Sequence, residues 1–329
     1  MKQRKLGQNG PTVGVVGYGA MSFTDFYGPT SDENSMGVLD TCLDLGITHL
    51  DTSNVYGMGR SETVIGNWLK QRGGACPFTI ATKGGITRDS GRRFNNDPKH
   101  LEEALDASLT RLGVEAVDLY YVHRREAEIE IEDVTETLAG FVKAGKVKAI
   151  GFSEIAPSSL LRAHAVHPVA AVQSEYSLST RSPEMGLVQA CAQIGASLVA
   201  FSPLGRGLLT DRPHQAAAIA GMDFLKVNPR FIEPNLSANL AINAQFRALA
   251  ADLGVPAATL AIAWLIHQGD HVLPIPGTRH VTHLQEVAAG GALDLSDEAL
   301  ARIDKILPIG WAHGDRYSVG QWMGPEKYC

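Results

Sequence analysis

The sequence has few cysteines, and their spacing argues against two classes of small structural site. The four cysteines are Cys42, Cys76, Cys191 and Cys329, and no two of them form a C-x-x-C pair. This scatter fits neither a disulfide framework nor a cysteine-based zinc site. Free thiols are typical of a reducing compartment, so we expect a cytoplasmic protein.

Long hydrophobic runs and blocks of like charge are also missing. Residues 1–10 are polar, without the apolar core of a secretory signal. No apolar run approaches the ~18 residues that a membrane span needs. The formal net charge is −6, with acids and bases spread along the chain. Without a basic stripe, the sequence predicts no nucleic-acid partner and no membrane partner.

The chain is instead rich in short β-branched runs. With 329 residues, 44% of them hydrophobic, it can form a large core, and no proline- or serine-rich linker divides it. We therefore predict a single domain, residues 1–329. Apolar residues run on without alternating, as in strands buried on both faces, in eight segments. These segments begin at Val13, Thr48, Phe78, Val117, Val147, Val169, Ala196 and His271.

Helical segments lie between these predicted strands. Residues 97–113 have a capping Asp97, a proline in the first turn and a terminal Gly113. Residues 31–46 begin with capping residues and acids and end at Gly46. Strands that alternate with helices pair in parallel through right-handed crossovers. Both an open doubly wound sheet and a closed barrel fit that rule. The count of eight favours a (β/α)₈ TIM barrel.

Three segments fall outside the repeat. Residues 1–12 predict a β-hairpin around Asn9-Gly10, which could plug the floor of the barrel. The segment from Gly205 to about Asn239, after the seventh strand, predicts a long loop, which in a compact domain is usually functional or disordered. The aromatic C-terminal tail, residues 310–329, shows no helical pattern and is expected to lie over part of the barrel.

Polar residues follow three consecutive predicted strands, at the end of a barrel where active sites form. Asp51 and Tyr56 follow the second strand, Lys83 the third and His123 the fourth. Each alone has an ordinary structural explanation, such as a turn or a solvated charge. Their equivalent positions favour a catalytic interpretation.

The chemistry of these four residues suits carbonyl reduction. A lysine ammonium ~4 Å from a tyrosine hydroxyl favours the phenolate by roughly three pKa units, and burial of the phenol opposes that shift. Asp51 would hold Lys83 charged, and His123 would bind a substrate oxygen. Tyr56 would then protonate an oxygen that becomes negative.

A metal site is the alternative use of such residues. The pairs His164/His167 and His280/His283 have helical spacing, but neither has a third ligand nearby in the sequence. We therefore predict no metal.

Four elements together resemble the aldo-keto reductases, which are (β/α)₈ barrels that use NADPH or NADH. They are "LDTSNVYGMGRSE", "IATKGG", "DLYYVHR" and "AFSPLGRGLLT" followed by "PIPGTR", in the family's order. The stretch "HPVAAVQSEYSLSTR" is similar to the bacterial and plant branch of general aldehyde and ketone reductases. The resemblance implies a tetrad of Asp51, Tyr56, Lys83 and His123, with Tyr56 as general acid and base.

The resemblance also implies a set of coenzyme contacts. For the nicotinamide these are Gly19, Met21, Ser153, Gln173 and Phe201, for the pyrophosphate Ser202, Leu204, Gly205 and Gly207, and for the adenosine end Gly277, Thr278, Arg279, His283 and Glu286. "GYGAMS" lacks the last glycine of the Rossmann fingerprint, so no Rossmann mode is expected. Neutral histidines near Arg279 hold a 2′-phosphate less firmly than arginines. NADPH is expected, and NADH stays possible.

Three functions fit this pattern. The first is a reductase of aldehydes and ketones, with a small-molecule carbonyl as its partner. The second is an NAD-dependent dehydrogenase of a sugar or pyridoxal-type alcohol, and the third a cofactor-sensing regulatory subunit. Phe23, Phe26, Tyr27 and Trp311 are candidates to line the pocket, or else to pack at its rim. The physiological substrate and the oligomeric state do not follow from the sequence.

Overall fold

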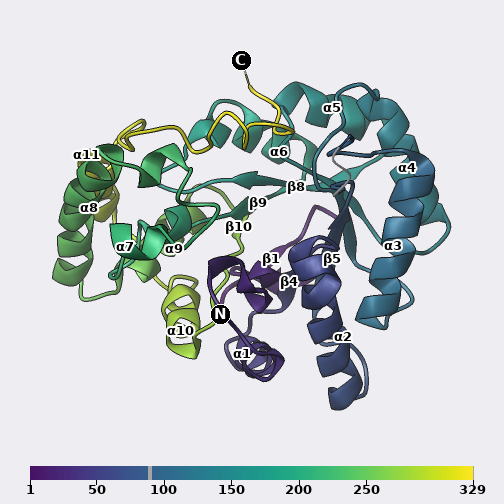
Figure 1. Cartoon of the computed structure of the whole chain (residues 1–329), viewed down its shortest axis with the longest axis horizontal. Coiled ribbons are helices and arrows are strands. Elements are labelled where there is room, and N and C mark those ends of the chain that lie inside the picture. The colour runs from purple at the N-terminus through teal and green to yellow at the C-terminus, as the bar shows by residue number, and fades with distance from the viewer. Residues whose placement is uncertain (88–90, 329) are drawn as a thin grey trace.

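Strands and helices alternate along the chain and form a (β/α)₈ TIM barrel, as predicted. The computed structural model describes residues 1–87 and 91–328 (Figure 1). Eight parallel strands follow one another around the sheet in chain order. They are β3 (Tyr18–Gly19), β4 (His49–Asp51), β5 (Thr79–Gly84), β6 (Leu119–Val122), β7 (Ile150–Ser153), β8 (Val169–Glu175), β9 (Ser197–Phe201) and β10 (Val272–Pro274).

Two backbone hydrogen bonds join the first strand region to the last. The Gly17 amide donates to the Pro274 carbonyl at 2.9 Å, and the Gly19 amide donates to the Pro276 carbonyl at 3.1 Å. Both edges of the sheet are thereby paired, which removes the free edges of an open sheet. The open doubly wound alternative is therefore wrong.

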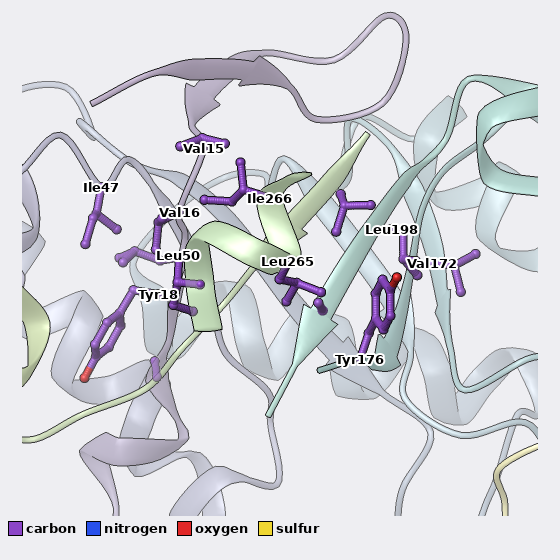
Figure 2. Packing of buried hydrophobic residues seen from close by; sticks show 14 of the residues in the cluster. Val15, Val16, Tyr18, Ile47, Leu50, Val172, Tyr176, Leu198, Leu265 and Ile266 are labelled. Atoms are coloured by element: carbon purple, nitrogen blue, oxygen red, sulfur yellow. The ribbon is translucent and has the colours of Figure 1, made fainter. Parts of the chain in front are cut away.

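Helices that follow the strands in the chain surround the sheet. They are α1 (Asp32–Asp44), α2 (Arg60–Arg72), α3 (Pro98–Leu112), α4 (Ile131–Lys143), α5 (Pro157–Val166), α6 (Leu187–Ile194), α9 (Ala257–His267) and α10 (Val281–Ala289). The cap of α3 is as expected, with the Asp97 side chain accepting from the Lys99 amide and Gly113 in the left-handed conformation. Figure 2 shows the apolar layer between strands and helices, in which Leu265 and Ile266 of α9 lie among strand residues.

The predicted hairpin is present, but its bounds differ. β1 (Gln3–Lys5) pairs with β2 (Thr12–Gly14), so Val13 belongs to the hairpin and not to the first barrel strand. The reason is that Asn9-Gly10 lies within a longer turn, which the Leu6 amide closes by donating to the Pro11 carbonyl. Leu6 and Val13 join the cluster inside the barrel, and the hairpin covers its floor.

The segment after β9 carries more structure than a loop. It contains α7 (Ala216–Ile219) and leads into α8 (Asn235–Asp252), which packs against α11 (Asp297–Ile306). It also has a small apolar core of its own, formed by Leu208, Ile219, Leu225, Phe231 and Leu236. α7 has only four residues, which is too few to give a periodic signal in the sequence.

The cysteines and the apolar helices of the described residues bear on two expectations from the sequence. Cys42, Cys76 and Cys191 are free thiols, and Cys329 lies outside the described residues. Within the same residues, no single helix is long and apolar enough to cross a membrane, although α8 and α9 pass that test jointly across an 89° bend.

The contact between α2 and α3 gives the first prediction. A Cβ atom at Gly66 would lie 2.1 Å from the Arg111 carbonyl oxygen, whereas at Gly140, an exposed position of α4, it would meet no atom within 4 Å. Gly66→Ala should therefore lower the free energy of unfolding by about 1–3 kcal/mol. Gly140→Ala should raise it by about 0.5–1 kcal/mol. Urea denaturation of both variants measures this, and equal effects would contradict the close approach of the helices.

Candidate active site

The four predicted catalytic side chains meet at the carboxyl ends of β4, β5 and β6. Ala81 faces the barrel interior, and Lys83, two residues later, faces the same side. Lys83 Nζ donates to Asp51 Oδ1, to the Thr52 carbonyl at 2.8 Å and to the Tyr56 hydroxyl at 3.4 Å. The side chains of Lys83 and Asp51 are buried, so water does not screen this ion pair.

The burial of this pair determines the proton states of Lys83 and Tyr56. Burial lowers the pKa of the Lys83 ammonium, but the Asp51 carboxylate and Tyr56 raise it more, so its net pKa lies above the ordinary value. Burial raises the pKa of the Tyr56 phenol more than the Lys83 charge lowers it. Burial, which was expected to oppose the shift that Lys83 causes, therefore outweighs it, and the phenol holds its proton at neutral pH.

His123 follows β6 and faces Tyr56. The ring centroids of the two residues are 5.8 Å apart, with the rings edge to face. His123 Nδ1 lies 3.0 Å from Ser53 Oγ. Burial lowers the pKa of His123 well below its ordinary value, and the charges of Lys83 and Arg124 lower it further. The imidazole is therefore neutral at neutral pH, with Nδ1 engaged by Ser53.

The residues predicted to hold the nicotinamide carboxamide lie beside this group. Gln173 Nε2 donates to Asp51 Oδ2 at 2.7 Å, so it belongs to the network around Lys83. Ser153, the last residue of β7, accepts a hydrogen bond of 3.0 Å from Arg124 Nη1. Gln173 and Ser153 are both buried, which leaves them rigid polar groups at one end of the barrel.

The predicted pyrophosphate segment follows β9. Phe201 ends the strand, Ser202 has a positive φ of 48°, and Leu204 leads into a short 3₁₀ helix, Gly205–Gly207. At Gly207, with φ of +94°, a Cβ would lie 2.9 Å from the His214 ring. The backbone of this segment is therefore tightly turned and held close to the loop that follows it.

The predicted adenosine segment follows β10. A Cβ at Gly277 would lie 2.4 Å from the Gly19 carbonyl oxygen, so these two loops lie against each other, with Met21 just beyond Gly19. The Thr278 carbonyl accepts from the Tyr18 hydroxyl. Arg279 Nη1 donates to the Pro29 carbonyl at 3.0 Å. The segment is thereby fixed to the loop before α1.

The last two predicted contacts are on α10. His283 is exposed and lies edge to face with His280, and the Glu286 carbonyl accepts from Thr259. A cavity of about 310 Å³ adjoins this region. It is lined by Pro29, Thr30, Ser31, Asn34, Arg279 and His280.

A buried ion network beside the site was not anticipated. Arg316 of the tail donates to Glu154, which follows β7. Arg206, after β9, donates to Glu175 at the end of β8. Burial raises the pKa of Glu175, but the charges of Arg206, Arg316 and Arg230 lower it more, to below its ordinary value. The partners are up to 162 positions apart in the chain, so no local pattern could reveal them.

Aromatic side chains from three loops cover the same end of the barrel. Phe224, in the segment after β9, lies 5.6 Å from Phe26 and 6.3 Å from Tyr317 of the tail, measured between ring centroids. The tail, yellow in Figure 1, crosses the molecule above β8, as expected. Phe23 and Trp311 are buried and belong to the main apolar core cluster.

The histidine pairs do not form a metal site in the described residues. His164 Nδ1 accepts from the Val169 amide at 3.2 Å, and His280 contacts His283. Over residues 1–87 and 91–328, no three histidine, cysteine, aspartate or glutamate side chains lie together in a way that could hold a metal ion.

Comparisons with known proteins agree with this arrangement. The sequence model of the Aldo/keto reductase family matches residues 15–308. An aldo-keto reductase of Schizosaccharomyces pombe, yakc [NADP(+)], is 39% identical over 96% of this chain and 94% of its own length. A probable aldo-keto reductase 1 of Glycine max is 37% identical over 99% of this chain and 94% of its own.

Two solved structures have the same fold. The glycerol dehydrogenase AKR11B4 from Gluconobacter oxydans superposes with a TM-score of 0.81 and 26% identity, over 93% of this chain and 94% of its own. A thermostable aldo-keto reductase, Tm1743, in complex with the inhibitor epalrestat, gives a TM-score of 0.73 and 26% identity. That match covers 93% of this chain and 100% of the other.

The lowered pKa of His123 gives a prediction on stability. Because the folded state disfavours the protonated imidazole, the free energy of unfolding should fall as pH drops below the unfolded-state value near ~6.5, by up to about 1.4 kcal/mol per pH unit for this group. In His123→Gln, the loss of stability between pH 7.5 and 5.5 should be smaller than in the unmodified protein. Urea denaturation at both pH values measures it.

A matched control removes an exposed histidine. His267→Gln, at the end of α9, should show the same loss between the two pH values as the unmodified protein. A loss in His123→Gln as large as in this control would mean that His123 does not carry the pH dependence.

Proposed function

Because the chain belongs to the Aldo/keto reductase family, whose members are NAD(P)H-dependent oxidoreductases, we propose that it reduces aldehydes and ketones to alcohols with NADPH. The observation that carries the proposal is the contact of Tyr56 with Lys83, beside the neutral His123. A protonated phenol and a neutral imidazole are the two groups that a carbonyl oxygen needs as it becomes negative.

Tyr56 acts as the general acid in this proposal. When bound, the reduced nicotinamide supplies a hydride to the carbonyl carbon. Tyr56 donates its proton to the carbonyl oxygen, and Lys83 stabilises the phenolate that remains. Asp51 keeps Lys83 charged and in place, and Gln173 fixes the other oxygen of Asp51. The phenolate regains its proton from water, which completes the cycle.

His123 orients the carbonyl oxygen. We assign His123 the neutral tautomer in which Nδ1 accepts from the Ser53 hydroxyl, 3.0 Å away, and Nε2 donates its proton to the substrate. A charged imidazolium would compete with Tyr56 as the proton donor. Because the lowered pKa of His123 keeps the imidazole neutral, His123 acts only as a hydrogen-bond donor.

The residues present fit a nicotinamide dinucleotide. Ser153 and Gln173 offer buried polar groups beside Asp51, where a carboxamide would bind. The turned backbone at Gly205 and Gly207 suits close approach of a pyrophosphate. Arg279 borders a cavity and offers a cation for a 2′-phosphate. The name of the S. pombe relative, which includes NADP(+), also supports NADP as the coenzyme.

An NAD-dependent alcohol dehydrogenase is a second candidate. Arg279 already donates to the Pro29 carbonyl, and the neighbouring His283 is exposed. Both features would weaken binding of a 2′-phosphate. In addition, one similar structure is named a glycerol dehydrogenase. Initial rates with NADPH and with NADH, in the presence of the same carbonyl panel, separate the two candidates.

Removal of the Tyr56 hydroxyl tests the catalytic role. Tyr56→Phe should lower kcat for carbonyl reduction by about 10²–10⁴-fold, because general acid catalysis contributes that much. NADPH binding, followed by the fluorescence of the coenzyme, should change less than about 3-fold. Lys83→Met should lose turnover as well. Turnover within about 3-fold of the unmodified enzyme in Tyr56→Phe would refute the proposed acid.

Replacement of Arg279 tests the coenzyme preference. Arg279→Gln should raise KM for NADPH by about 10- to 100-fold, because a charge-assisted hydrogen bond to phosphate is lost. The KM for NADH should change less than about 3-fold, since NADH lacks that phosphate. An equal change in KM for the two coenzymes would mean that Arg279 supports the loop and does not bind the 2′-phosphate.

A further inference from the structure

Arg124 places a guanidinium directly beside the catalytic group. It follows His123 at the end of β6 and is half-buried. Its Nη1 donates to the His123 carbonyl at 2.7 Å and to Ser153 Oγ at 3.0 Å. The tail also approaches Arg124, since a Cβ at Gly324 would lie 3.3 Å from the Arg124 Cβ. The side chain is therefore held on several sides, at the edge of the site.

The charge of Arg124 is not balanced by the protein. Its neighbour Arg125 pairs with Glu326 at 2.6 Å, and Arg316 pairs with Glu154. Across the described residues, no carboxylate lies within 4.0 Å of Arg124, and its Nε and Nη2 donate to no protein acceptor. Neither nitrogen is among the described buried polar atoms that lack a partner, so each retains some exposed surface.

The positive charge reaches the reacting groups. Arg124 lowers the pKa of Tyr56, after the larger effects of burial and of Lys83. It also lowers the pKa of His123, after burial and Lys83. Lys83 is paired with Asp51, whereas Arg124 retains donors without a partner among the described residues.

We propose that Arg124 binds a carboxylate of the substrate while Tyr56 and His123 hold its carbonyl oxygen. The substrate class is then an aldehyde or ketone that carries a carboxylate. The inference rests on the proposed function and deepens it. Nε and Nη2 lie on one edge of the planar guanidinium, and this fork matches the two oxygens of a carboxylate.

Matched pairs of aldehydes test the proposal. Succinic semialdehyde is compared with butanal, and 4-carboxybenzaldehyde with methyl 4-formylbenzoate. In Arg124→Gln, kcat/KM should fall about 10- to 100-fold for the two acids, chiefly through KM, because a charge-assisted pair is lost. For each uncharged aldehyde the fall should be at least about 10-fold smaller than for the acid of its pair, because any effect of the variant through Ser153 or His123 is common to both.

Arg93 offers a control with the same change of charge. It is exposed, and its Nη1 donates to the Gly320 carbonyl of the tail. Arg93→Gln should change kcat/KM less than about 3-fold for all four aldehydes. An equal fall for acids and uncharged aldehydes in Arg124→Gln would overturn the proposal, since Arg124 would then act through Ser153 or His123. No fall for the acids would overturn it too.

A binding measurement separates this inference from the proposed function. Turnover of butanal by the unmodified protein tests the reductase activity alone. Calorimetry with the NADP⁺-loaded protein compares benzoate with terephthalate, which has a second carboxylate. The second carboxylate should tighten binding about 10-fold or more in the unmodified protein and less than about 3-fold in Arg124→Gln. Equal ratios in the two proteins would overturn the proposal, whether or not any carbonyl is reduced.

Discussion

The structure of the site depends on one buried ion pair. Lys83 and Asp51 are both withdrawn from water, and a buried charge is stable only when it is paired and hydrogen-bonded. The Thr52 carbonyl, the Tyr56 hydroxyl and the Gln173 amide complete those hydrogen bonds. The hydrogen bonds that offset the cost of burying this ion pair also hold the phenol of Tyr56 next to the ammonium of Lys83. Fold stability and chemistry therefore share one set of atoms.

The barrel provides this geometry because of its register. Lys83 and Tyr121 are partners in neighbouring strands, and Asp51 is the partner of Ala81. Side chains alternate inward and outward along a strand, so the inward residues of neighbouring strands form layers. The hairpin residues Leu6 and Val13 fill the bottom layer, and the polar groups occupy the top one. Polar side chains thus collect at the one end where loops can cover them.

The sequence was sufficient to predict the strands, the barrel and the meeting of Asp51, Lys83 and Tyr56, because these follow from apolar runs and strand ends. It was not sufficient for contacts set by tertiary packing. The pKa of Tyr56 is a clear example. Burial of the phenol outweighs the effect of Lys83, and the extent of that burial cannot be read from a sequence. Arg316 and Glu154 are another, since their contact joins the tail to β7. The hairpin bounds failed because Asn9-Gly10 also fits a longer turn.

Backbone strain is concentrated where these contacts lie. Over the described residues, the non-glycine positions with positive φ are Met58, Glu154, Ser202 and Arg206, all in loops at the carboxyl ends of the strands. Asparagine adopts that conformation more readily than glutamate. At Glu154 it would relax the main chain but abandon the anchor for Arg316. A substitution made to increase thermal stability at this position therefore exchanges a relaxed backbone against the ion pair that holds the C-terminal tail.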